Sequence, residues 1–286
     1  MPTTIYKSFQ KLKNNLEITS LQESIVSNRQ KAVRKVVEAD FNILNSFLTG
    51  SYSRHTMIAP LKKADVDIFM VLDPSYYEEN GQPKLLDKVK NTLKKEYPKT
   101  PKISRNRQAI TITFSDFIVD VIPAFYRRGG GFLIPSTIGN QWISTDPRKH
   151  VEIFANANRE HEGDLVPLIK MIKAWNRSID QFFNSFHLEV LALDILNNVN
   201  INNFHSGMRY YFDHGRAKVK VQNLDPAGYS GDVGYYLNSK LSDAESRFET
   251  AYKRAIKAEE YEKKGKTSDA VNEWKKIFGS SFPSYG

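Results

Sequence analysis

Residues 48–73 read LTGSYSRHTMIAPLKKADVDIFMVLD, and the fold can be predicted by starting from this segment. A Gly-Ser pair, Gly50-Ser51, stands before a polar loop that ends at Asp65-Val66-Asp67. The apolar run that follows, from Ile68 to Leu72, is short and rich in branched and aromatic residues, which is typical of a buried strand. Residues two apart in a strand share a face, so we expect the carboxylates of Asp65 and Asp67 to project together.

A third acidic residue, Asp120, lies inside a second apolar run at residues 117–123, FIVDVIP. An ionised carboxylate in a buried strand is costly without a partner. If the two strands pair, the three carboxylates converge, and their mutual repulsion favours a divalent cation among them. Carboxylates suit Mg²⁺, and paired metal ions about 3.5–4 Å apart promote in-line displacement at phosphorus. The sequence therefore predicts two Mg²⁺ ions, or Mn²⁺, at Asp65, Asp67 and Asp120. The alternative is that these residues only make turns and caps.

The ordered set of Gly50-Ser51, Asp65-x-Asp67 and Asp120 resembles the polymerase-β-type nucleotidyltransferase superfamily. The segments GSYSRHT-x-I-x-PL, DVDI and VDVIPAF are similar to those of bacterial relatives of cyclic GMP-AMP synthase, the CD-NTases, and the similarity covers nearly the whole chain. The resemblance implies a bilobal α+β fold. Residues 1–160 would form a mixed-sheet catalytic lobe braced by a long N-terminal helix, and residues 161–286 a helical lobe that completes the nucleotide pocket.

Periodicity along the chain fits this organisation. A short helix is predicted near residues 5–17, and a capping box at Ser20-Leu21-Gln22-Glu23 predicts the start of a longer one. A further helix is predicted at residues 83–97, and helices dominate from about residue 163. Besides the run after Asp67, strands are predicted near residues 46–49, 102–106, 109–114 and 117–122.

Five residues are candidates for binding the triphosphate. Gly50 allows close approach of the backbone, and the Ser51 hydroxyl can hold phosphate oxygens; an ordinary turn is the alternative. The segment LIKMIKAW resembles a family helix whose lysine grips the donor triphosphate, which implies Lys173 as first choice and Lys170 as second. Two lysines that snorkel over a core helix are the alternative. By the same resemblance Ser185 supports these phosphates, or it is a plain N-cap.

Composition sets broad limits. The absence of cysteine among the 286 residues excludes disulfides and thiolate metal sites. No apolar run is long enough to cross a membrane, and the N-terminus lacks a signal-peptide core, so a cytoplasmic location is expected. The net charge of +9 fits either a triphosphate pocket or nucleic-acid binding and does not decide between them.

The resemblance implies a metal-dependent nucleotidyltransferase. It would join ribonucleoside triphosphates, ATP among them, into a cyclic di- or trinucleotide second messenger for anti-phage (CBASS-type) signalling. The product would activate a separate effector protein, without need of a membrane or of nucleic acid, and we expect a monomer. One alternative is transfer to another acceptor, such as an RNA end, a small molecule or a protein. Another is an inactive nucleotide-binding relative, although such proteins usually lose a metal carboxylate.

Overall fold

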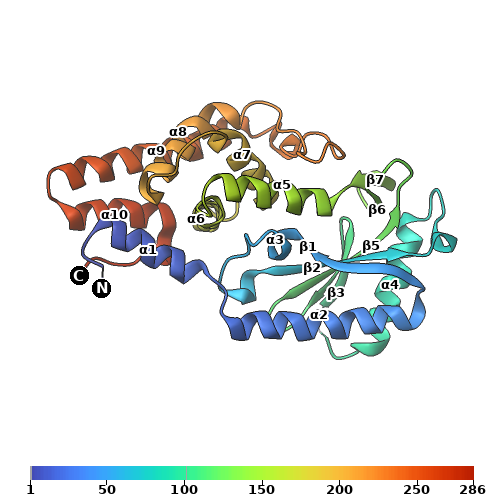
Figure 1. Cartoon of the computed structure of the whole chain (residues 1–286). Coiled ribbons are helices and arrows are strands. Elements are labelled where there is room, and N and C mark those ends of the chain that lie inside the picture. Colours follow the sequence, from blue (N-terminus) through green and yellow to red (C-terminus); the bar gives the residue numbers. More distant parts are fainter. Residues whose placement is uncertain (1, 101) are drawn as a thin grey trace. The chain divides into compact units, whose positions relative to one another are not determined.

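The computed structural model describes residues 2–100 and 102–286 and divides into two compact units. The sheet unit comprises residues 18–152. The helical unit comprises the N-terminal residues up to Glu17 together with residues 153–286 (Figure 1). The chain passes from one unit to the other after α1 (Ile5–Leu16) and again within α5 (Pro147–Glu160).

A mixed β-sheet forms the centre of the sheet unit. The strands are β1 (Ile43–Thr49), β2 (Asp65–Leu72), β3 (Lys102–Asn106), β4 (Ala109–Thr113), β5 (Ile118–Tyr126), β6 (Phe132–Ser136) and β7 (Gln141–Thr145). Their order is β1-β2-β5-β4-β3, with β6 and β7 continuing from β5. β2 and β5 are parallel, whereas the other pairs are antiparallel. The predicted mixed sheet is confirmed, because every strand expected from an apolar run is present.

The two faces of β2 have different surroundings, because side chains alternate along a strand. One face packs in the main core of the unit with side chains of α2 (Ser20–Asp40) and α4 (Gln82–Glu96). The residues of this face are Val66, Ile68, Met70 and Leu72. The opposite face begins with Asp65 and Asp67 and continues into a smaller apolar cluster that contains Phe69. The alternation therefore presents two carboxylates at the start of a strand that is otherwise buried.

The start of α2 differs by one residue from the prediction. Its N-cap is Thr19, whose hydroxyl accepts a hydrogen bond from the Gln22 N–H at 3.3 Å, while the Gln22 side chain accepts one from the Thr19 N–H at 2.9 Å. The capping box is real but lies one position before Ser20. Leu21, in the first turn, is 71% exposed, and the first buried residue of α2 is Val26.

The helical unit is built around α6 (Leu165–Ser178), where nearly every residue from Leu165 to Asn176 is buried. The Trp175 ring on α6 packs against three phenylalanine rings, at centroid distances of 4.9–5.5 Å. Phe9 of α1 packs against Trp274 at 4.9 Å. The remaining helices are α7 (Ser185–Leu196), α8 (Phe204–Lys218), α9 (Leu241–Lys263) and α10 (Thr267–Phe278).

The two units differ from the expected division into residues 1–160 and 161–286 at two places. The first helix groups with the helical unit, and the second boundary falls between residues 152 and 153. The reason is the apolar stripe of α1, whose Ile5, Phe9, Leu12 and Leu16 are buried and whose contacts include α6, α8 and α10. A short amphipathic helix is stabilised mainly by the surface that covers its apolar face.

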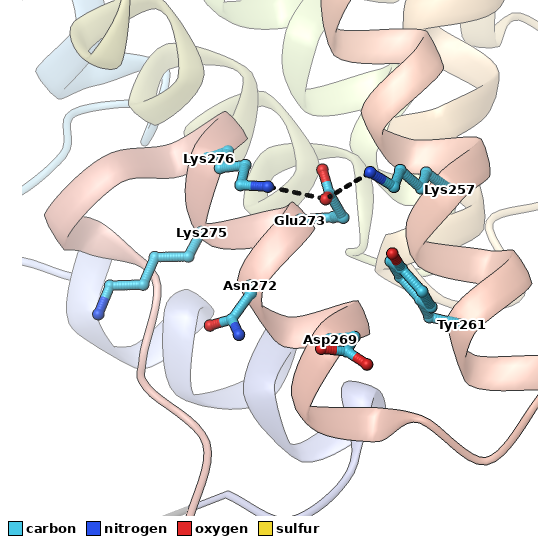
Figure 2. Close-up of a pocket in the computed structure, with 7 residues that line it drawn as sticks. All are labelled: Lys257, Tyr261, Asp269, Asn272, Glu273, Lys275 and Lys276. Carbon is cyan, nitrogen blue, oxygen red and sulfur yellow. Dashed lines mark hydrogen bonds and ion pairs between the residues drawn. The ribbon is translucent and has the colours of Figure 1, made fainter.

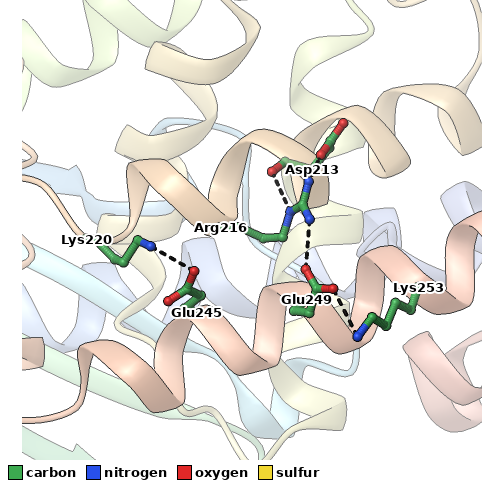
Figure 3. Close-up of polar contacts among 6 residues, drawn as sticks. All are labelled: Asp213, Arg216, Lys220, Glu245, Glu249 and Lys253. Carbon is green, nitrogen blue, oxygen red and sulfur yellow. Dashed lines mark hydrogen bonds and ion pairs between the residues drawn. The ribbon is translucent and has the colours of Figure 1, made fainter.

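Ion pairs join α8 to α9. Arg216 on α8 pairs with Asp213 of its own helix and, at 2.8 Å, with Glu249 of α9, which also pairs with Lys253 at 3.1 Å (Figure 3). A second pair, Lys220–Glu245, joins the segment just after α8 to α9 at 2.8 Å. Such partly exposed pairs contribute about 0–1 kcal/mol each. Within residues 2–100 and 102–286, the helices are too short or too polar to span a membrane.

A pocket of about 510 Å³ lies along α9 and α10 within the helical unit (Figure 2). Glu273 stands on one wall, and its carboxylate pairs with Lys257 at 3.3 Å and with Lys276 at 2.8 Å. Burial acts to raise the pKa of Glu273. The hydrogen bonds and charges of Lys276 and Lys257 together outweigh burial, so the pKa of Glu273 lies below its ordinary value. The pocket is lined by residues of the helical unit, whereas the three predicted metal ligands belong to the sheet unit.

Candidate active site

The register of β2 and β5 brings the three predicted carboxylates together. Parallel pairing places Asp67 directly opposite Asp120, and Asp65 lies two residues before Asp67 on the same face. One ligand oxygen from each of the three residues lies within 4.8 Å of the others. The convergence expected from two separate apolar runs is therefore present.

The three carboxyl groups differ in exposure, and this difference has a chemical effect. Asp120 is 9% exposed, whereas Asp65 is exposed and Asp67 is half-buried. Burial raises the pKa of Asp120 to about 6; the charge of Asp65 adds to the rise, and a hydrogen bond from Thr111 opposes it. The Thr111 hydroxyl donates this bond to Asp120 Oδ1 at 2.5 Å from the neighbouring strand β4. Thr111 was not predicted as a site residue; the alternation of AITIT at residues 109–113 was its only signal.

The donor set fits a divalent cation of the Mg²⁺ type. All three candidate ligands are carboxylates, which hard cations prefer over nitrogen or sulfur. Without a cation their charges repel, and the raised pKa of Asp120 records part of that repulsion. A bound cation would remove the repulsion and hold Asp120 ionised.

Gly50 lies against one of these carboxylates. It follows β1 directly, where Thr49 pairs with Asp67, and it begins the four-residue helix α3 (Gly50–Ser53). Its φ is +65°, and a Cβ atom built on it would lie 1.8 Å from Asp67 Oδ2. Only glycine fits here, because the position requires both a left-handed backbone and the absence of a side chain. Ser51 is half-buried, and its carbonyl accepts hydrogen bonds from Thr56 and Met57 that fix the following loop.

Lys170 and Lys173 lie on α6 in the helical unit, and each has a carboxylate partner. Lys173 Nζ lies 3.2 Å from Oε1 of Glu189 on α7, and the two side chains are 9% and 0% exposed. Lys170 pairs with Glu17, whose side chain is 44% exposed. Neither lysine extends along the surface into solvent, as the snorkelling alternative required, because α6 is buried on nearly all sides. Both carboxylate partners were missed at the sequence level.

Ser185 is exposed and is the first residue of α7. The N-cap of this helix is Asn184, whose side chain accepts a hydrogen bond from the Phe186 N–H at 3.0 Å. The alternative role for Ser185, a plain N-cap, is therefore wrong, because Asn184 already supplies the capping oxygen.

Comparison with known proteins shows which family the chain belongs to. A family model described as the Second Messenger Oligonucleotide or Dinucleotide Synthetase (SMODS) domain matches residues 3–158, more than half of the chain. The chain belongs to this family. It is a bacterial CD-NTase, and its enzymatic class is nucleotidyltransferase, of the kind that makes oligonucleotide second messengers.

Relatives of this SMODS protein cover most of its length. A probable cyclic nucleotide synthase of Bacillus cereus (strain VD146) is 27% identical over 96% of this chain and 96% of the relative. A cyclic AMP-AMP-AMP synthase of an Acinetobacter species is 22% identical over 84% of this chain and 73% of the relative. The solved structure of E. coli MS115-1 CdnC with ATP has a TM-score of 0.77 at 19% identity, covering 98% of this chain and 99% of that one. These likenesses confirm the predicted α+β polymerase-β-like fold.

The first prediction concerns the SMODS residue Gly50. We expect Gly50→Ala to lower turnover on the order of 10²-fold, because the added methyl group displaces the Asp67 carboxylate from its position. Steady-state assay of pyrophosphate release measures this. Gly265→Ala is the matched control: its φ is +70°, but nothing lies within 4 Å of the added Cβ. It should therefore carry the same backbone strain and keep full activity. Equal turnover in Gly50→Ala and wild type would contradict the contact's importance.

The stabilisation of the protein by Mg²⁺ should depend on pH. The pKa of Asp120, about 6, exceeds its ordinary value of 3.8, so proton binding stabilises the metal-free sheet unit below pH 3.8, and this contribution is lost as pH rises through 6. Metal binding must displace that proton. We therefore expect the Mg²⁺-induced rise in Tm to be large at pH 7.5 and to shrink at pH 5. At pH 5 the protonated form of Asp120 outnumbers the ionised form about tenfold in the metal-free protein. Thermal unfolding with and without Mg²⁺ checks this, and an equal Mg²⁺ effect at both pH values would argue against it.

Proposed function

We propose that this protein is a metal-dependent synthase of a cyclic di- or trinucleotide second messenger made from ribonucleoside triphosphates, ATP among them. The observation that carries the proposal is the convergence of Asp65, Asp67 and Asp120 on adjoining strands in a chain of the SMODS family. Cyclisation and the use of ATP are supported by the relatives, which include a cyclic AMP-AMP-AMP synthase and a CdnC solved with ATP.

Asp65, Asp67 and Asp120 are proposed as the ligands of two Mg²⁺ ions, with Mn²⁺ as an alternative ion. When bound, the ions would neutralise charge on the phosphates and favour in-line displacement at phosphorus. Asp65 and Asp67 are the more exposed pair and would face the triphosphate. Asp120 is the deepest, and Thr111 holds one of its oxygens in place. This leaves its other oxygen for the reacting groups.

The transfer step forms one bond and breaks one. A ribose hydroxyl oxygen attacks the α-phosphorus, the bond to the bridging oxygen breaks, and pyrophosphate leaves. The hydroxyl proton passes to Asp120, directly or through water. A bound cation would hold Asp120 ionised, which is the form that can accept this proton.

Gly50, Ser51, Lys170, Lys173 and Ser185 are proposed to hold the triphosphate. The Gly50-Ser51 backbone is the part of this set that adjoins a metal ligand directly. Ser51 and Lys173 would hold the leaving pyrophosphate, where negative charge develops in the transition state, and Ser185 would support the same phosphates. Lys170 is the second choice, as in the family resemblance, and its present partner Glu17 is 44% exposed.

A cyclic product requires at least two such transfers. The first yields a linear intermediate that keeps a 5′ triphosphate, which must rebind so that its other end can attack and close the ring. The product would then activate a separate effector protein in anti-phage signalling, a role supported by an E. coli relative named as a CBASS oligonucleotide cyclase. Ribonucleoside triphosphates are cytoplasmic metabolites, so we place the enzyme in the cytoplasm.

The alternatives differ in the acceptor or in activity. Transfer to an RNA end, a small molecule or a protein would use the same metal site with a different nucleophile. An inactive nucleotide-binding relative is disfavoured by the retention of all three carboxylates. Neither alternative is favoured by a specific contact.

The test is to incubate the purified protein with all four ribonucleoside triphosphates and Mg²⁺ alone, and to identify the product by mass spectrometry. A cyclic product resistant to phosphatase supports the proposal and identifies the bases. A linear product sensitive to phosphatase argues against cyclisation, and turnover only after addition of RNA or protein favours another acceptor.

A further inference from the structure

The connection from residue 219 to residue 240, between α8 and α9, has a framework of its own. Two aspartates build it by accepting hydrogen bonds from nearby backbone groups. Asp225 accepts from the N–H groups of Ala227, Tyr229 and Ser230 and from the Ser230 hydroxyl, at 3.0–3.1 Å. Asp232 accepts from the N–H groups of Asn223 and Gly234, at 3.0 and 2.8 Å. A long connection with this much internal bonding is an ordered element, and such elements are often functional.

Tyr236, in the short helix η3 (Tyr235–Leu237), ties this connection to the start of α7. Its hydroxyl accepts a hydrogen bond from the Asn184 N–H at 2.8 Å and lies 2.9 Å from Nδ1 of His187. The two rings meet edge to face, with centroids 5.6 Å apart. The tautomer of His187 decides which of the two groups donates in the contact between Nδ1 and the Tyr236 hydroxyl.

The contact is close and carries an energetic cost. His187 is 0% exposed, and burial lowers its pKa to about 4, so the ring is neutral at physiological pH. A Cβ atom on Gly234 would lie 3.1 Å from the His187 ring, so a larger residue there would require the ring to shift by a few tenths of an ångström. Within the part of the chain that the structure describes, no hydrogen-bond partner reaches His187 Nε2. A buried polar group without a partner is destabilising, and native proteins retain such costs mainly at functional sites.

We propose that Tyr236 and His187 are positioning residues that hold the first turn of α7, and with it Ser185, in place for the triphosphate. Ser185 stands between the two residues that the Tyr236 hydroxyl contacts, Asn184 and His187. Through these contacts the connection 219–240 fixes the first turn of α7 and therefore the position of the exposed Ser185. The inference rests on the proposed role of Ser185 in binding phosphate.

Tyr236→Phe tests the inference, because it removes the hydroxyl and keeps the ring. Ser178→Ala is the control: it also removes a hydroxyl that joins two elements of the same unit, because Ser178 at the end of α6 donates to the carbonyl groups of Trp175 and of Ile277 on α10, and neither contact involves α7. Both variants should lose a similar, small amount of Tm. We expect only Tyr236→Phe to raise KM for ATP, about tenfold, which corresponds to ~1.4 kcal/mol.

A double-mutant cycle distinguishes an effect of Tyr236 that acts through Ser185 from a general loss of stability. If Tyr236 acts through Ser185, Tyr236→Phe should have much less effect on KM in a Ser185→Ala background than in wild type. Unchanged KM in Tyr236→Phe, equal KM increases in Tyr236→Phe and Ser178→Ala, or fully additive effects with Ser185→Ala would each overturn the inference.

Affinity for a non-hydrolysable ATP analogue distinguishes failure of this inference from failure of the proposed function. Wild-type protein that binds the analogue but forms no product would end the proposed function, and the same comparison of variants would then be made on the analogue's Kd. Wild-type protein that does not bind the analogue would overturn both.

Discussion

Asp67→Asn is expected to lower turnover on the order of 10³-fold or more while leaving the fold intact. The side chain stands at the centre of the site: it pairs with Asp120 across β2 and β5 and adjoins Gly50. The substitution keeps the shape but removes the charge that a metal ion requires, and with it transition-state stabilisation. Pyrophosphate release measures turnover, and circular dichroism checks the fold.

The Mg²⁺ dependence of Tm and a control variant test whether the loss of activity comes from the metal site. The Mg²⁺-induced rise in Tm should shrink in Asp67→Asn, because the site has lost one ligand. Asp73→Asn is the matched control, since Asp73 lies just beyond the other end of β2 and caps the short helix η2 (Pro74–Tyr76) by accepting from the Ser75 N–H. Asparagine caps a helix as well as aspartate does, so this control should keep its activity. Wild-type turnover in Asp67→Asn would mean that the site lies elsewhere.

Lys173→Met is expected to lower the free energy of unfolding of the helical unit by about 3–5 kcal/mol. The Glu189 carboxylate is 0% exposed and would lose the ammonium group that lies 3.2 Å from it. Lys170→Met should cost far less, about 0–1 kcal/mol, because its partner Glu17 is 44% exposed and can be solvated. Denaturant titration followed by tryptophan fluorescence measures both, since Trp175 and Trp274 lie in this unit.

The double variant Lys173→Met/Glu189→Leu separates the two roles of Lys173. Replacing both partners of a buried ion pair by apolar residues often restores stability. We expect stability to recover but KM for ATP to stay raised about tenfold or more, because the cation that would hold the phosphates is still missing. Recovery of both stability and KM would show that Lys173 is only structural.

The metal ligands were predictable from sequence because their pattern is local. Asp65 and Asp67 open an apolar run, and Asp120 interrupts another, so each signals a carboxylate at a strand. Their convergence needed one further assumption, that the two strands pair, and the parallel β2–β5 register supplies it. The long helix was also visible, although its cap fell on Thr19, since hydroxyl residues at adjacent positions cap equally well.

The partners of the site were not predictable in the same way. Thr111, Glu189 and Glu17 carry no motif, and each meets its partner only through the tertiary fold. The separation of Glu17 from Lys170 by 153 positions shows why no window of sequence contains the information. Pairs of this kind follow from packing, and patterns in a single sequence report packing only as alternation or period.

The pairing of β2 with β5 sets a limit on how this chain can vary in length. Side chains in a strand alternate with a period of two, so one residue inserted after Val66 would turn Asp67 inward, toward the apolar core, and carry its hydrophobic neighbours outward. A turn between strands can absorb the same insertion without moving any of the three acids. Evolution of these synthases should therefore have been free to edit their loops while leaving the spacing within these two strands untouched.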